Sequence, residues 1–331
     1  MTTNRLTRRD VLRVAAAGAA AASVPFASAQ SSGWPTKPVN VIVPFPAGGG
    51  TDAFARPLAA QFAKQTGRQL IIDNKGGAGG TVGATLASRA APDGYNFFMG
   101  AVHHTIAPHI YPRLDYDLQK DLIPISLVAR VPQVIVVNPQ RIPAKDFKEF
   151  LALVKANPGK YNYASAGNGT SHHLAGELFK LQTKTFITHI PYRGAGPALQ
   201  DLITGSADLM FDGLGSSAGH IKGGRIKALM VAGNARNAAF PDVPSAKEVG
   251  LPDYNVTSWY GIWAPKGTPA DVQARMADEI RKAMASEELK TVWANQGAEF
   301  PNLSQQQFAA FIDGEIKRWG QVVKASNVKA D

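Results

Sequence analysis

The feature that most constrains the fold of this chain is a regular alternation of short, β-rich apolar runs with longer helical patterns, beginning near residue 39. The apolar runs predict strands at 39–45, 69–73, 96–100, 134–138, 161–164, 188–192, 208–212 and 227–232. The helical patterns predict helices at 52–66, 82–90, 144–157, 171–183, 197–204, 269–285 and 304–325. This order is typical of α/β proteins with parallel sheets. After about Pro265 the pattern is purely helical.

Two extended segments favour a two-domain organisation. Residues 126–138 and 256–264 are apolar or aromatic and bounded by proline, and 331 residues suffice for two domains. A chain that crosses at both segments has a first lobe at 30–130 with 257–331 and a second lobe at 131–256. We therefore expect an α/β fold with two Rossmann-like lobes joined by two crossing strands. Ligands of open α/β sheets bind beyond the carboxyl ends of the strands, so the cleft between the lobes is the expected site.

Residues 1–29 are typical of an export signal. Arginines precede an alanine-rich apolar stretch at 11–24, and Ala27-Ser28-Ala29 is a small-residue cleavage site. Arg8 and Arg9 are similar to a twin-arginine signal, and an ordinary secretory signal is the alternative. We expect cleavage after Ala29 and a soluble periplasmic protein. The absence of cysteine excludes a lipid anchor, disulfides and thiol chemistry.

The basic charge does not indicate nucleic acid. Removing residues 1–29 takes away four Arg and one Asp, which lowers the formal charge from +10 to +7. The remaining Lys and Arg residues are dispersed, and no recognisable nucleic-acid module accompanies them. A mild positive field that attracts small anions fits this distribution better.

Two glycine-rich segments, each between a predicted strand and a predicted helix, are candidate ligand loops. Glycine lets backbone N–H groups approach a ligand, and the helix N-terminus that follows favours an anion. The alternative for each is a turn that needs glycine for geometry alone. Thr51 or Asp52 is the expected N-cap of the first helix. The candidates are Phe45, Ala47, Gly48, Gly49, Thr51 and Asp52 in the first loop, and Ser165, Gly167, Asn168, Thr170 and Ser171 in the second.

Because the two loops belong to lobes that face each other, they suggest a carboxylate held by backbone donors from both sides. Closure of the lobes then follows from ligand contacts to both of them, through a hinge and a population shift.

Other candidates lie outside these loops. His103, His104 and Thr105 follow the third predicted strand, and a histidine there can donate a hydrogen bond into the cleft. Adjacent histidines on a strand point to opposite faces, and no carboxylate stands beside them at a metal-ligand spacing, so we predict no metal site. Arg193 can meet an anion or be exposed, and Asp212 can accept a hydrogen bond in the cleft or cap the next helix.

Two motifs that are typical of enzymes are weak evidence of enzymatic function in this chain. Residues 48–53 fit a dinucleotide-binding fingerprint, and Asp73 ends the next predicted strand. However, Pro46-Ala47 lengthens the turn, and an exported protein rarely has access to free NAD. We therefore predict no cofactor. Residues 215–219 fit the elbow of a serine hydrolase with Ser217 as nucleophile. The only histidine downstream is His220, three residues away, so a triad in that chain order is not available.

Longer motifs run from Trp34 almost to the C-terminus. They include VNVIVPFPAGGGTDAFAR (39–56), DNKGGAGGTVGA (73–84), NPGKYNYASAGNGTSHHLAGELF (157–179), PYRGAGPALQDLITGSADLMFD (191–212) and SWYGIWAPKGTP (258–269). In these motifs the chain resembles the Bug, or TctC-type, extracytoplasmic solute receptors of tripartite tricarboxylate transporters. The resemblance implies a type II periplasmic-binding-protein fold that clamps a small carboxylate without chemistry, through main-chain N–H groups and water at 47–52 and 165–171. It also implies that 101–105 is a specificity loop of the first lobe.

The sequence therefore predicts a periplasmic solute-binding protein rather than an enzyme. We expect a monomer that binds a dicarboxylate, tricarboxylate, aromatic carboxylate or acidic amino acid and delivers it to the membrane permease of a tripartite transporter. The alternatives are a ligand-sensing receptor for a two-component system and an exported serine hydrolase that uses Ser217.

Overall fold

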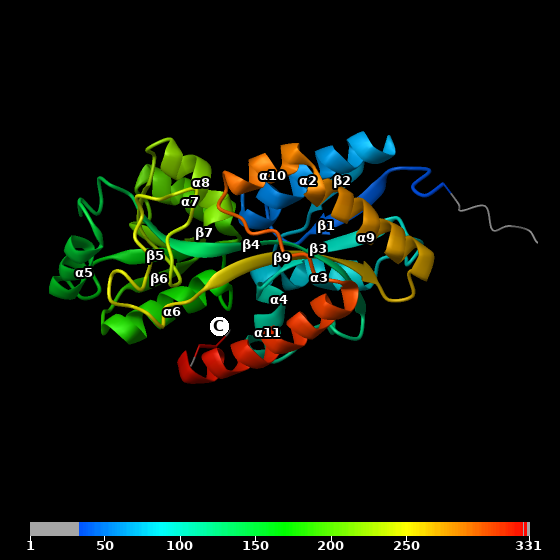
Figure 1. Ribbon diagram of the computed structural model, residues 1–331. Helices are drawn as coiled ribbons and strands as arrows, with labels where there is room; N and C mark the ends of the chain where they lie inside the picture. The colour runs from blue at the N-terminus through cyan, green and yellow to red at the C-terminus, as the bar shows by residue number, and fades with distance from the viewer. Residues whose placement is uncertain (1–32, 327, 330–331) are drawn as a thin grey trace, which may run out of the picture. The chain divides into compact units, whose positions relative to one another are not determined.

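Two long antiparallel strands connect the two lobes of the fold. In a computed structural model, which describes residues 33–326, 328 and 329, β4 (Leu122–Val137) pairs with β9 (Thr257–Pro265) from Leu122 opposite Pro265 to Pro132 opposite Thr257 (Figure 1). They include the two segments expected to cross between the lobes. The predicted export signal lies outside the described residues.

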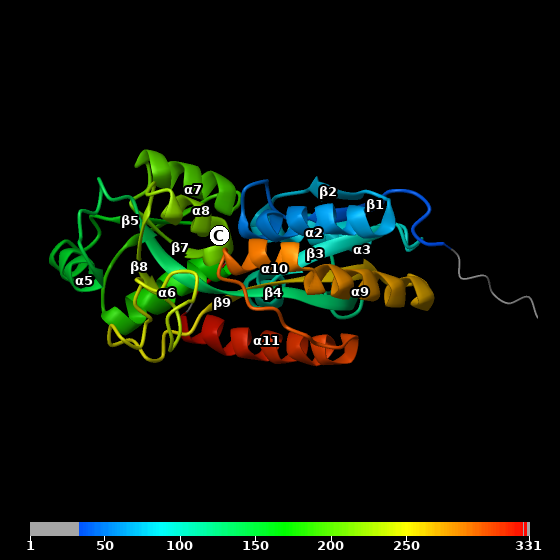
Figure 2. The same cartoon turned by 45° about the horizontal axis from the view of Figure 1, so that its top comes forward.

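The first lobe is built on the strand order β2-β1-β3-β9-β4. Strand β1 (Val39–Val43) is parallel to β2 (Leu70–Asn74) and β3 (Asn96–Ala101), whereas β3 is antiparallel to β9. Helices α2 (Gly50–Thr66), α9 (Ala270–Ala285) and α10 (Glu287–Ala294) pack together on one face (Figure 2). Helices α3 (Thr81–Ser88), α4 (His103–Ile110) and α11 (Gln305–Ser326) cover the other, with the short helix η1 (Ala78–Gly80) before α3.

The second lobe continues the sheet through the C-terminal half of β4, which pairs antiparallel with β7 (Leu209–Gly213) and β8 (Lys227–Val231). Strand β5 (Asn162–Ser165) lies parallel to β7 and to β6 (Thr188–Pro191). Helices α7 (Ala195–Thr204) and α8 (Leu214–Lys222) lie on the face opposite α6 (Ser171–Thr183), and α5 (Phe147–Ala156) packs against β8 (Figure 1).

Helix α2 shows how the sequence dictates an element of this fold. Phe54, Leu58 and Phe62 are four residues apart, so they lie on one face of the helix, and each is at most 1% exposed. Burying each such side chain contributes about 1.5–3 kcal/mol. Gly67 ends the helix with φ 67°, a left-handed conformation that favours glycine.

The fold class is as predicted: two Rossmann-like lobes joined by two crossing strands. Several details differ from the sequence prediction. Helices α4 and α10 occur where no helix was predicted, and α4 occupies the segment expected to be a specificity loop. Helix α8 begins at Leu214, where a helix start was expected after the strand at 208–212. The sheet is mixed rather than parallel, because the crossing strands and β8 run antiparallel to their neighbours. Helix α7 begins at Ala195, two residues before the predicted start, and Pro197 occupies its first turn.

Candidate functional site

Four helices begin around one small cavity between the lobes. Helices α2 and α4 of the first lobe start at Gly50 and His103, and α6 and α7 of the second lobe start at Ser171 and Ala195. The inner cavity is lined by Phe45, Gly49, Gly50, Thr51, His103, Ala166, His172, Ala195 and Tyr260. The first N–H groups of a helix lack acceptors within it, and they give its N-terminus a partial positive charge. Four such ends around one point favour an anion there.

The inner cavity has a volume of about 10 Å³, which is the space of about one water molecule. The lobes are therefore closed upon each other. None of the described residues that line the cavity is Lys or Arg. Attraction for an anion at this point therefore comes from helix ends, backbone N–H groups and neutral polar side chains such as Thr51 and Tyr260.

In the first loop, Asp52 holds the backbone rather than facing the cavity. Its carboxylate accepts hydrogen bonds from the Gly48 N–H (3.1 Å), the Arg56 Nε (2.8 Å) and the Asn74 amide (3.2 Å). The N-cap of α2 is Gly49, so the prediction that Thr51 or Asp52 caps this helix is wrong. Gly48 has φ 83°, and its bond to Asp52 fixes the turn that presents Gly49, Gly50 and Thr51 to the inner cavity.

In the second loop, hydroxyl groups stabilise the turn itself. Ser165 Oγ accepts from the Gly167 N–H (3.1 Å) and lies 2.6 Å from His189 Nε2. Thr170 caps α6 by accepting from the His173 N–H, and its hydroxyl donates to the Gly167 carbonyl (2.8 Å). Because these polar side chains bond within the loop, the groups that remain available to a ligand are mainly backbone groups.

The loops of the two lobes touch at several points. Tyr111 of the first lobe donates its hydroxyl hydrogen to the Asn168 carbonyl of the second (3.1 Å). Ala47 contacts Gly196 so closely that a Cβ at Gly196 would overlap the Ala47 carbonyl oxygen. A Cβ on Gly49 would lie 3.5 Å from the Ala195 side chain. Small residues at this boundary are what allow the closed arrangement.

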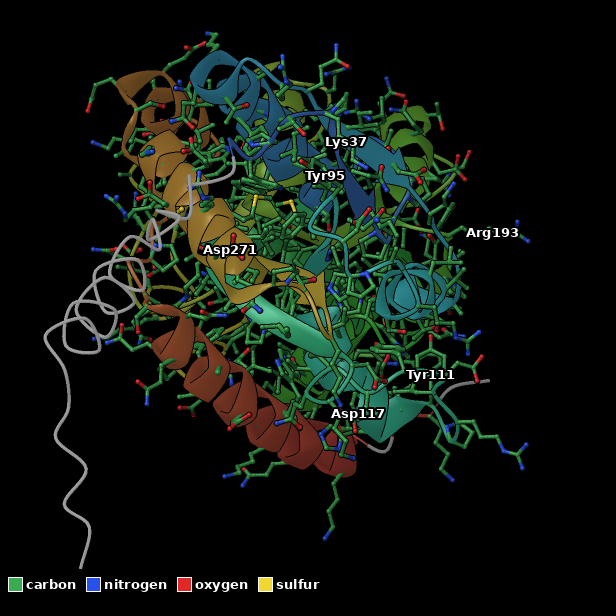
Figure 3. The ribbon with its side chains drawn as sticks, turned by 90° about the vertical axis from the view of Figure 1, so that its right-hand side faces the viewer. Lys37, Tyr95, Tyr111, Asp117, Arg193 and Asp271 are labelled. Carbon is green, nitrogen blue, oxygen red and sulfur yellow. The ribbon has the colours of Figure 1, made fainter. Side chains whose placement is uncertain are left out.

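A second cavity, of about 310 Å³, lies at the mouth of the cleft. It is lined by Phe45, Gly77, Ala78, Gly79, Gly80, Tyr111, Ala166, Gly167, Asn168, Pro191, Tyr192 and Arg193. Phe45 and Ala166 also line the inner cavity, so the two spaces adjoin. The Arg193 side chain is exposed and points away from the body of the molecule (Figure 3). Arg193 therefore stands at the rim of the mouth cavity, not in the interior.

The predicted histidines and Thr105 divide into two groups. His103 lines the inner cavity, and its Nδ1 accepts a hydrogen bond from the Ser171 N–H across the lobes (3.0 Å). His104 turns into the first lobe, where its Nδ1 accepts from the Ala101 N–H (3.0 Å). Burial lowers the pKa of His103 well below the ordinary value and that of His104 to about 4. The Thr105 hydroxyl donates to the Val102 carbonyl (2.7 Å), so His104 and Thr105 serve the fold.

Asp212, near the end of β7, is fully buried and lies behind the cavity lining rather than in it. Its Oδ2 accepts hydrogen bonds from the hydroxyls of Ser216 (2.7 Å) and Ser217 in the first turn of α8. His172 Nε2 lies 3.6 Å from Oδ1, which has no hydrogen-bond partner. Burial, with a contribution from Asp212, raises the pKa of Tyr260 above its ordinary value. This cluster therefore ties β7 to the first turn of α8, and it reaches the inner cavity only through His172.

Within residues 33–326, 328 and 329, no group of three or more His, Cys, Asp or Glu residues is placed to hold a metal ion. Nor does any helix in that part of the chain have the length and apolar character needed to cross a membrane.

Residues 54–328 match the family described as "Tripartite tricarboxylate transporter family receptor". The chain belongs to this family. Among solved structures, this receptor is similar to the periplasmic binding protein BugD (TM-score 0.86, 34% identity, covering 90% of this chain and 100% of that one). It is also similar to R. palustris Rpa4515 with adipate (TM-score 0.86, 30% identity, 90% and 100% covered). A third similar structure is MatC from Rhodopseudomonas palustris with bound malate (TM-score 0.82, 35% identity, 88% and 100% covered).

These comparisons confirm the Bug or TctC-type resemblance inferred from the motifs, and they confirm the periplasmic-binding-protein fold. Sequence reasoning identified two of the four helix N-termini in the receptor's cleft and missed those of α4 and α7. It also missed Gly50 and Tyr260, whose hydroxyl lies so close to Gly50 that a Cβ there would overlap it. The helix itself was predicted at 197–204, and the signal that could have placed its start at the cleft is Gly194-Ala195-Gly196-Pro197, a glycine turn with proline in the first helical turn.

Proposed function

We propose that this protein is a periplasmic receptor that encloses a small carboxylate between its two lobes and delivers it to the membrane permease of a tripartite transporter. The observation that carries this proposal is the convergence of four helix N-termini, two from each lobe, on one buried cavity. Helix N-termini hold sulfate, phosphate or carboxylate groups, and the adipate and malate bound to the similar proteins favour a carboxylate here.

The two-sided arrangement also explains why the ligand would close the lobes. A helix N-terminus stabilises an anion by about 0.3–1 kcal/mol at an exposed site and by up to about 2 kcal/mol when partly buried. In an open form the anion meets the helix ends of only one lobe, whereas in the closed form it meets all four. A ligand shifts an equilibrium by its difference in affinity for the two forms, so this difference favours closure.

The mouth cavity suits the remainder of such a ligand. Its walls are backbone at Gly77–Gly80 and Gly167, with the rings of Phe45, Tyr111 and Tyr192 around them. The similar proteins Rpa4515 and MatC were solved with adipate and malate, which are small aliphatic dicarboxylates. Their ligands support the carboxylate class for this chain, and Arg193 at the rim is a candidate partner for a distal carboxylate.

The buried position of Ser217 argues against the serine hydrolase alternative. Ser217 lies within α8, is fully buried, and donates its hydroxyl hydrogen to Asp212. A nucleophile elbow instead presents its serine at an exposed, sharp turn between a strand and a helix.

A thermal-shift and calorimetric screen tests the proposal. Malate, adipate, citrate, benzoate and glutamate are offered to the purified mature protein, with a neutral sugar and a cationic amine as comparison ligands. We expect at least one carboxylate to raise the melting temperature and to bind by calorimetry. Binding of the sugar or the amine with no response to any carboxylate would overturn the proposal.

Gly49→Val tests the two-sided site. Gly49 has φ −87°, which valine adopts readily, so the variant should fold. Its branched side chain would press against Ala195 and hold the lobes apart, and we expect at least a 10-fold loss of carboxylate affinity. Gly314→Ala is the matched control, because a Cβ at Gly314 meets nothing within 4 Å. Gly167 is a poorer test site, since its φ of 129° makes any substitution strain the loop. Unchanged carboxylate affinity in Gly49→Val would contradict the proposal that both lobes hold the ligand.

We also propose that export removes residues 1–29, so that the mature chain starts at Gln30. The intact mass of the protein from a periplasmic extract tests this, and a mature start at any other residue would refute it. Export in a host that lacks the twin-arginine translocase distinguishes the two kinds of signal.

A further inference from the structure

One buried hydrogen bond joins the two lobes through a group that can take up a proton. His103 is the first residue of α4 in the first lobe, and Ser171 is the first residue of α6 in the second. The Ser171 N–H donates to His103 Nδ1 at 3.0 Å, and both residues are buried. A nitrogen that accepts this bond carries no proton. A doubly protonated imidazole has only donors, so it cannot form the bond.

The surroundings of His103 also oppose a positive charge. The titratable groups around the ring are His104 on the same helix, His172 on α6, whose ring centre is 5.6 Å away, and Tyr260 on β9. The N-termini of α4 and α6 add positive partial charge. The buried carboxylate of Asp212 lies 3.6 Å from His172 Nε2 and accepts a hydrogen bond from the Ser216 hydroxyl. The Phe45 ring packs edge-on against His103.

The other buried histidines around the cleft bond within their own lobes. His104 accepts from Ala101 in the first lobe. His173 and His189 stack at 3.9 Å within the second lobe. Opening of the lobes therefore leaves these three in place, whereas it separates His103 from Ser171 and exposes His103 and His172 to water.

We propose that the His103–Ser171 hydrogen bond is a latch between the lobes that forms only when His103 is neutral, so that capture of a ligand releases a proton in a weakly acidic medium. The inference rests on the proposed function, because it assigns a residue that positions the lobes for ligand binding. In this role His103 acts through Ser171 and is a positioning residue rather than a ligand contact.

The direction of the pH dependence follows from the two forms. In the open form His103 faces water and titrates near its ordinary pKa of about 6.5, whereas burial in the closed form lowers that pKa well below this value. The contribution of His103 to closure is therefore fully present above about pH 6.5, and it is lost as the pH falls. One such histidine weakens ligand affinity about 10-fold between pH 7.5 and pH 5.5.

Two variants separate the latch from a merely structural role. His103→Asn keeps an acceptor near the position of Nδ1 and does not titrate. Because His103 also lines the inner cavity, the quantity compared is the ratio of affinities at pH 7.5 and pH 5.5 within each protein, and this ratio should be about 10-fold smaller in His103→Asn than in the native protein. His103→Phe fills the space without an acceptor, and it should bind at least 10-fold more weakly at both pH values. His109→Gln, on the same helix but bonded to Ile316, is the control that keeps the native pH effect. Equal pH effects in native protein and His103→Asn would overturn the latch, as would tighter binding at pH 5.5.

A second measurement tests the latch without any ligand. The chain has no cysteine, so Val82→Cys on α3 and Leu181→Cys on α6, both exposed, place two spin labels on opposite lobes. Pulsed electron resonance should show the short interlobe distance in a larger share of molecules at pH 7.5 than at pH 5.5. His103→Asn should reduce this difference, and the remainder comes from His172, whose pKa burial also lowers. A pH response that His103→Asn leaves intact would refute the latch. If no carboxylate binds the native protein at either pH, the proposed function fails, and the distance measurement still decides the latch.

Discussion

The sequence contains two adjacent histidine pairs, His103-His104 and His172-His173, and the structure uses them in the same way. Each pair lies in the first turn of a helix that starts at the cleft, α4 in the first lobe and α6 in the second. In each pair one member, His103 or His172, lines the inner cavity. The other member turns into its own lobe, where His104 meets Ala101 and His173 stacks on His189.

The comparison shows that the helical repeat determines which histidine of each pair faces the cleft and which faces the core. Neighbouring residues on a helix are about 100° apart around its axis, because a turn holds 3.6 residues. One member of a pair can therefore face the opposite lobe while its neighbour faces the core of its own. The histidines that face the core should govern folding stability, and those that face the cleft should govern closure and binding.

The largest expected effect is that of His104→Ala on stability. The substitution removes a ring that is 1% exposed and leaves the Ala101 N–H without its acceptor. We expect the free energy of unfolding to fall by about 3 kcal/mol in a denaturant titration. A loss below about 1 kcal/mol, together with altered ligand selectivity, would return His104 to the ligand site where the sequence placed it.

Acid should destabilise the protein through the same residue. The pKa of His104 is lowered to about 4 in the folded state and is about 6.5 in the unfolded chain, so its contribution is present above pH 6.5 and lost as the pH falls toward 4. Between pH 7.5 and pH 5 this amounts to about 2 kcal/mol of unfolding free energy. His103→Asn should retain this loss, because opening the lobes relieves His103 without unfolding. A stability that stays constant over this range would contradict the buried, neutral His104.

His173→Ala should have an intermediate effect. It removes the stack on His189 and the acceptor of the Gly169 N–H, which lies 3.2 Å from His173 Nδ1. We expect a loss of about 1.5 kcal/mol, measured by chemical denaturation, from the lost contact and the unsatisfied donor. If the pair comparison is correct, carboxylate affinity changes little in this variant. A large loss of affinity with native stability would reverse the assigned roles of His172 and His173.

The smallest change in stability is expected for His172→Leu. His172 Nδ1 is buried without a hydrogen-bond partner, so an apolar side chain of similar size removes little favourable interaction. Unfolding free energy should change by less than about 0.5 kcal/mol, while calorimetry shows weaker carboxylate binding because the ring lines the inner cavity. A loss of stability as large as that of His104→Ala would show that both members of a pair serve the core.

Much of the fold could be predicted from the chain, because the apolar pattern is local information. The predicted helix at 171–183 coincides with α6, and both crossing segments lie in or overlap β4 and β9. Helix α4 was missed because residues 101–105 were interpreted as a loop after a strand, and Pro108 inside the helix weakens the helical pattern. The mixed sheet was missed because strand direction depends on how the chain returns to the sheet, and a strand's own residues do not encode it.

The candidate site was predicted less completely. Glycine-rich turns before helices identified the ends of α2 and α6, since both signals are contained in a few adjacent residues. Asp52 and Thr170 bond to the backbone of their own loops, a role that the sequence pattern does not distinguish from a ligand contact, because a polar loop side chain can bond to nearby backbone groups. Tyr260 lies on the crossing strand, far along the chain from every loop it meets, so no local pattern indicated it.

By itself the sequence determined the family, the α/β class and the two glycine-rich loops that precede helices at the cleft. These properties depend on residue type and short spacing. Only the tertiary structure decided which histidine of each pair faces the cleft, that four helix ends meet, and that His103 accepts a hydrogen bond from the other lobe. The physical reason is that such contacts join residues far apart along the chain, and their geometry is fixed by the packing of two lobes around β4 and β9.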